Sequence, residues 1–132
     1  MSGDSVRSQI ADRLKEFLPD YVIDDYPADP DQVLRGRPYV DVYGTEITGL
    51  GENQLAHTVT INVMAVAGTP ALTEDALETA RDNVLIVLTQ HMPGVFPQRA
   101  ERQTFLENTY SGYGITVTAY SSNAYKKAEV TP

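Results

Sequence analysis

The sequence predicts an α+β fold: a mixed, mainly antiparallel β-sheet of about five strands, with two α-helices packed on one face. Two amphipathic segments with helical spacing, Val6–Leu18 and Asp75–Gln90, are separated by segments in which apolar and polar residues alternate. The expected order is therefore α-β-β-β-α-β-β. A chain of 132 residues has the size of one domain, so we expect residues 1–132 to form a single domain, with a flexible tail at 123–132.

The first helix is predicted over Val6–Leu18, where apolar residues recur every three or four positions and charged residues fill the opposite face. Pro19 ends this pattern. Tyr21–Ile23 is predicted to be a short strand. The following segment, Asp24–Asp31, is rich in aspartate and proline, which indicates a loop.

Two further strands are predicted at Pro38–Tyr43 and Thr58–Ala67, because side chains on one face of each are apolar and those on the other are mostly polar. Between them, Gly44–Ala56 contains three glycines and is predicted to be a long loop. Connections between neighbouring strands are usually short, so a loop of this length suggests a function. Its apolar side chains are the predicted contacts with a partner protein: Ile47, Leu50 and Leu55.

The second helix is expected to be capped by Thr73, with Glu74 and Asp75 in a first turn where they complement the helix dipole. Gly94 and Pro97 predict a loop after it. The expected buried stripe of this helix is Leu77, Ala80, Val84 and Leu88.

A hairpin is predicted to close the fold, with strands at Arg102–Tyr110 and Gly114–Ser121. Ser111, Gly112 and Tyr113 form the expected turn, because a glycine is common in short hairpin connections. The second strand alternates between apolar and polar positions, so we expect one of its faces to be buried. The residues expected on that face are Ile115, Val117 and Ala119.

Composition excludes several functions. The chain has no cysteine, which excludes disulfides and thiolate metal sites. Its formal net charge of −8 disfavours sequence-specific binding to nucleic acids. No apolar run reaches the ~18 residues that a membrane span needs, and no signal-peptide pattern is present, which predicts a cytosolic product.

The sequence offers little for catalysis. His57 and His91 are the two histidines, and we expect structural roles for both, at the start of a strand and the end of a helix. The glycines at 49 and 51 are not followed by the helix start of a phosphate-binding loop. The aspartate-rich segment lacks the spacing of a calcium-binding loop. We therefore predict no catalytic residues, no cofactor and no metal.

The predicted arrangement resembles the tail terminator family of long-tailed, siphovirus-type bacteriophages. The likeness rests on four segments and spans roughly residues 6–125. The segments are the opening helix Val6–Leu18, the strand Pro38–Tyr43 leading through a polar loop into His57–Ala67, the helix Asp75–Gln90, and the closing hairpin that ends in Ile115–Tyr120.

The resemblance implies that the chain is not an enzyme and needs no cofactor. Members of the family cap the finished tail tube as a hexameric ring, stop its polymerisation and provide the surface for head attachment. The implied partners are other copies of the chain, the major tail tube protein and a head-completion or neck protein. DNA would pass through the ring without sequence-specific binding. The expected location is the head-proximal end of the virion tail, after synthesis in the host cytoplasm.

Charged residues are assigned on the same basis. An acidic channel would keep DNA from adhering, so we expect a group of acidic residues at the lumen or rim: Asp20, Asp24, Asp25, Asp29, Asp31, Glu46 and Glu52. The expected contacts between subunits are Arg35, Arg37, Arg99 and Arg102. A plain alternative is that the aspartates only form a solvated surface.

An enzyme would require His57 or His91 to lie beside a carboxylate in a pocket. Two other binding functions remain open on the sequence. One is a different neck component, such as a head-completion or connector protein, which would bind the portal side instead of the tube. The other is a non-viral binding module whose sheet edge recruits a peptide.

Overall fold

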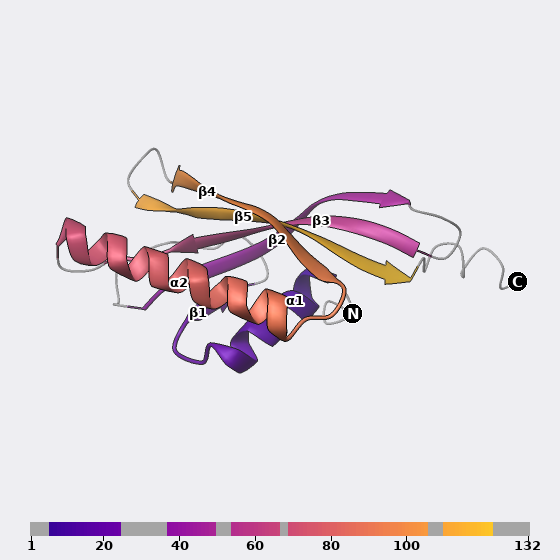
Figure 1. The fold of residues 1–132 in the computed structure, drawn as a ribbon, viewed down its shortest axis with the longest axis horizontal. Coiled ribbons are helices and arrows are strands. Elements are labelled where there is room, and N and C mark those ends of the chain that lie inside the picture. The colour runs from indigo at the N-terminus through magenta and orange to yellow at the C-terminus, as the bar shows by residue number, and fades with distance from the viewer. Residues whose placement is uncertain (1–5, 25–36, 50–53, 67–68, 106–109, 123–132) are drawn as a thin grey trace, which may run out of the picture.

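The computed structural model describes residues 6–24, 37–49, 54–66, 69–105 and 110–122. Five described strands form one sheet in the order β1-β2-β3-β5-β4, with both helices on one face (Figure 1). The α+β prediction and the order of elements are confirmed. The elements are α1 (Val6–Phe17), β1 (Val22–Asp24), β2 (Tyr39–Gly49), β3 (Gln54–Met64), α2 (Pro70–Gln90), β4 (Val95–Phe105) and β5 (Tyr110–Ser122).

The sheet is mixed. β1 is parallel to β2 and pairs with it only at three residues, whereas β2, β3, β5 and β4 are antiparallel to their neighbours. Each of the antiparallel strands is at least 11 residues long. The long antiparallel strands therefore form the frame on which β1 and the two helices are assembled.

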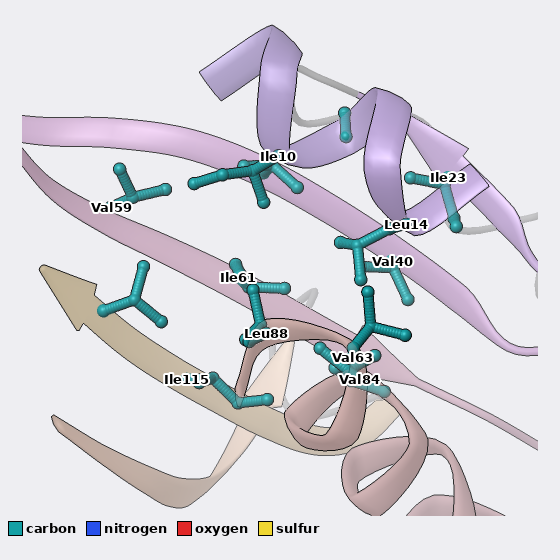
Figure 2. Packing of buried hydrophobic residues seen from close by; sticks show 14 of the residues in the cluster. Ile10, Leu14, Ile23, Val40, Val59, Ile61, Val63, Val84, Leu88 and Ile115 are labelled. Atoms are coloured by element: carbon teal, nitrogen blue, oxygen red, sulfur yellow. The ribbon is translucent and has the colours of Figure 1, made fainter. Parts of the chain in front are cut away.

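The core lies between the helices and the face of the sheet that they cover. Figure 2 shows Ile10 and Leu14 of α1 and Leu88 of α2 directed towards side chains of the central strands. Burying a large aliphatic side chain contributes roughly 1.5–3 kcal/mol. The strand residues that complete this core are Ile23, Val40, Val42, Val59, Ile61, Val63, Ile115 and Val117.

The start of α2 differs from the prediction. The helix begins at Pro70, and Thr69 rather than Thr73 is its N-cap: the Leu72 N–H donates to Thr69 Oγ1 at 3.2 Å. Proline suits the first helical position because that position needs no backbone N–H. The predicted buried stripe, Leu77, Ala80, Val84 and Leu88, is confirmed.

The predicted loop Gly44–Ala56 is wrong. β2 continues to Gly49 and β3 already begins at Gln54. A β-bulge between Gly44 and Glu46 takes up one extra residue, so glycine here bends the strand without ending it. The connection is reduced to residues 50–53, which lie outside the described residues.

The turn of the closing hairpin is also displaced from its predicted position. β4 runs over Val95–Phe105 and β5 begins at Tyr110, so residues 111–113 belong to a strand. Pro97 is tolerated because β4 is the last strand of the described sheet and has a bulge between Pro97 and Arg99. Residues 106–109, which join the two strands, lie outside the described residues, as does the predicted tail at 123–132.

Candidate docking surface

One end of the sheet extends past both helices in Figure 1. We call it the hairpin end: residues 46–49 of β2, 54–58 of β3 and 118–122 of β5. The three strands stay paired there, from Gly49 opposite Leu55 to Gln54 opposite Ser122. Most described residues of the predicted docking segment, Gly44–Ala56, lie in this end, where they form paired strands and not a loop.

The three apolar side chains predicted to contact a partner differ in their exposure. Ile47 lies in β2 with 54% of its surface exposed, whereas Leu55 in β3 is only 9% exposed. Leu50 lies outside the described residues. Leu55 therefore contributes to packing in the hairpin end, and Ile47 is the side chain that the structure places at the surface.

An aromatic pair lies on the opposite face of the sheet. Phe96 pairs with Thr118 on the face that the helices leave uncovered, and its ring meets that of Tyr120 edge-to-face with centroids 5.7 Å apart. Phe96 is 51% exposed and Tyr120 is 40% exposed. The sequence interpretation missed this pair because it assigned Phe96 to a loop. The alternation of Tyr120 with the buried residues Val117 and Ala119 was the available signal.

The predicted acidic rim is only partly described. Asp24 is half-buried in β1, whereas Asp20 and Glu46 are exposed. The structure does not bring these three into one cluster: Asp24 and Glu46 lie on different strands, and Asp24 pairs with Asp41. Asp25, Asp29, Asp31 and Glu52 lie outside the described residues.

Asp41 is a buried carboxyl group that the sequence interpretation did not recognise. It is 4% exposed, and Asn62 Nδ2 donates to its Oδ1 at 2.9 Å. Burial raises the pKa of Asp41 to about 6, and the charge of Asp24 adds to this effect, whereas hydrogen bonds from Asn62 and Tyr39 oppose it. Alternation along the strand predicted that Asp41 lies on the solvent-facing side of the sheet. This part of that side is buried too, because its neighbours Tyr39 and Met64 are also buried.

The predicted intersubunit arginines differ in their surroundings. Both terminal nitrogens of Arg102 donate to the carboxylate of Glu74, one of them at 2.8 Å, and this bond raises the pKa of Arg102. Its guanidinium also lies over the ring of Tyr113, as does that of Arg81 from α2. These contacts fasten the first half of α2 to β4 and β5, so Arg102 has a role within its own chain.

Arg99 and Arg37 are more accessible. The Arg99 side chain is exposed and lies 3.5 Å from the carboxylate of Glu101. Such exposed pairs contribute little to stability and exchange readily with other partners. Arg37 is exposed just before β2, and Arg35 lies outside the described residues.

The two histidines are in separate elements. His91 ends α2 as predicted: its backbone N–H donates to the Val87 carbonyl at 2.9 Å, and its ring stacks on Phe17 with centroids 3.9 Å apart. His57 lies inside β3 rather than at its start, and burial lowers its pKa. Among the described residues, no group of three or more His, Cys, Asp or Glu side chains is placed to hold a metal ion.

Neither described helix is long and apolar enough to cross a membrane. No protein-family model matches this chain, and a search of curated proteins also finds no match.

Proposed function

We propose that this protein is a structural component of a phage tail that caps the tail tube as a ring, stops tube polymerisation and provides the surface for head attachment. The proposal starts from the resemblance in sequence to tail terminators. The observation that carries it in the structure is the hairpin end, a paired sheet that extends past the helices and exposes Ile47. A rigid projection with an apolar side chain is suited to docking against another protein.

The proposed contact with the tube involves fewer residues than the sequence suggested. Leu55 is buried, so we assign the tube contact to Ile47 and not to Leu55. A strand-borne side chain is held in place before binding, which lowers the entropy lost on association relative to a mobile loop.

For contacts between subunits of the ring, Arg99 and Arg37 are the proposed candidates. Arg102 is a weaker candidate, because it already forms an ion pair with Glu74 and packs over the ring of Tyr113. Exchange of the exposed Arg99–Glu101 pair for an acidic group of a neighbouring copy would cost little. The net charge of −8 supports a channel through which DNA passes without adhering.

The test is to polymerise the candidate tail tube protein with increasing amounts of this chain and to measure tube length by negative-stain microscopy. We expect tubes that stop growing and carry an added ring at one end. Tubes of unchanged length and without rings would overturn the terminator assignment. Binding to the portal side in a parallel experiment would then identify a different neck component.

A matched pair of variants tests the docking contact separately. Ile47→Ser removes the proposed tube contact, and Ile86→Ser makes the same change at an exposed site on α2. We expect the Ile47 variant to need at least about tenfold more protein to stop tube growth, the effect of losing about 1.4 kcal/mol of binding free energy. The Ile86 variant should match the wild type. Equal capping by both variants would reject Ile47 as the contact and leave the terminator assignment standing.

A further inference from the structure

We draw no further inference here: the strongest candidate, the exposed aromatic patch of Phe96 and Tyr120 on the sheet face opposite the helices, carries nothing because nothing in the structure shows what covers it.

Discussion

The two ends of the sheet are covered to different extents. At the end where β2 begins, side chains are buried on both faces: Val40 and Val63 on the helix side, and Tyr39, Asp41 and Asn62 on the other. We call this the covered end. At the hairpin end, β2 exposes Ile47 on one face, and β5 exposes Tyr120, beside Phe96 of β4, on the other.

This difference indicates that the two ends of the sheet have different roles. The covered end buries apolar surface that stabilises the fold, and it is where Arg102 ties β4 to α2. The hairpin end retains regular pairing between strands but contributes less buried surface. Its exposed side chains can therefore change with little cost to folding, which is the property expected of a surface adapted to a partner.

The largest predicted effect compares one substitution at two isoleucines. Ile61→Ala opens a cavity in the core and should lower the free energy of unfolding by about 2–5 kcal/mol. Ile47→Ala removes an exposed side chain at the hairpin end and should change it by no more than about 0.5 kcal/mol. Urea denaturation of both variants measures the difference. A large loss in the Ile47 variant would show that the hairpin end is part of the folding core.

The second prediction concerns the pH dependence that Asp41 gives to the covered end. The pKa of this carboxyl rises from 3.8 to about 6 on folding, so the folded state binds the proton more tightly than the unfolded chain. Well below pH 4 the carboxyl is protonated in both states, so it does not destabilise the fold. The destabilisation caused by burying the Asp41 charge is complete once the pH is well above 6. The expected loss across this range is about 3 kcal/mol.

Asp41→Asn isolates this contribution, because it removes the charge and keeps an oxygen that can accept from Asn62. The difference in stability between variant and wild type should be small at pH 4 and favour the variant at pH 8. Chemical denaturation at both values, at constant ionic strength, measures it. A difference that does not change with pH would mean that Asp41 titrates normally in the folded protein.

A third prediction concerns the start of α2. Thr69→Ala removes the side-chain oxygen that accepts from the Leu72 N–H and should cost about 1 kcal/mol. Thr73→Ala, at the position that the sequence favoured as the cap, should cost clearly less. Thermal unfolding of the two variants ranks them, and a reversed order would place the helix start at Thr73.

The sequence was a reliable guide where burial follows a simple period. The opening helix, the stripe from Leu77 to Leu88 and the alternation in β5 are confirmed, because each has one apolar face that must be covered. Glycine and proline were misleading. Gly44, Pro97 and Gly112 all lie inside strands. A bulge follows Gly44, Pro97 lies beside a bulge in the last strand of the described sheet, and Gly112 is paired on both sides in β5.

The candidate site was less predictable for a related reason. Ile47 and Leu55 look alike in the sequence, and they lie on the same face of the sheet, because Ile47 pairs with His57, two residues from Leu55 in β3. The bulge between Gly44 and Glu46 places Ile47 on this face. The different exposure of the two side chains therefore depends on their tertiary surroundings, which alternation along a strand cannot indicate. The burial of Asp41 likewise depends on coverage of a second sheet face, which alternation along one strand cannot indicate.

The smallest predicted effect concerns how the covered end holds α2. Arg102→Gln removes the ion pair with Glu74 and one of the two guanidinium groups over Tyr113. The side chains of Arg102 and Glu74 are 42% and 44% exposed, so water screens the ion pair and global stability should hardly change. Hydrogen exchange should instead increase in the first half of α2, because the main polar contact that opposes local opening there is lost.

In the wild type, added salt should produce part of the same increase, because it screens the ion pair between Arg102 and Glu74. Unchanged exchange in the variant would show that apolar packing by Leu77 and Ala80 is sufficient to hold α2 on the sheet.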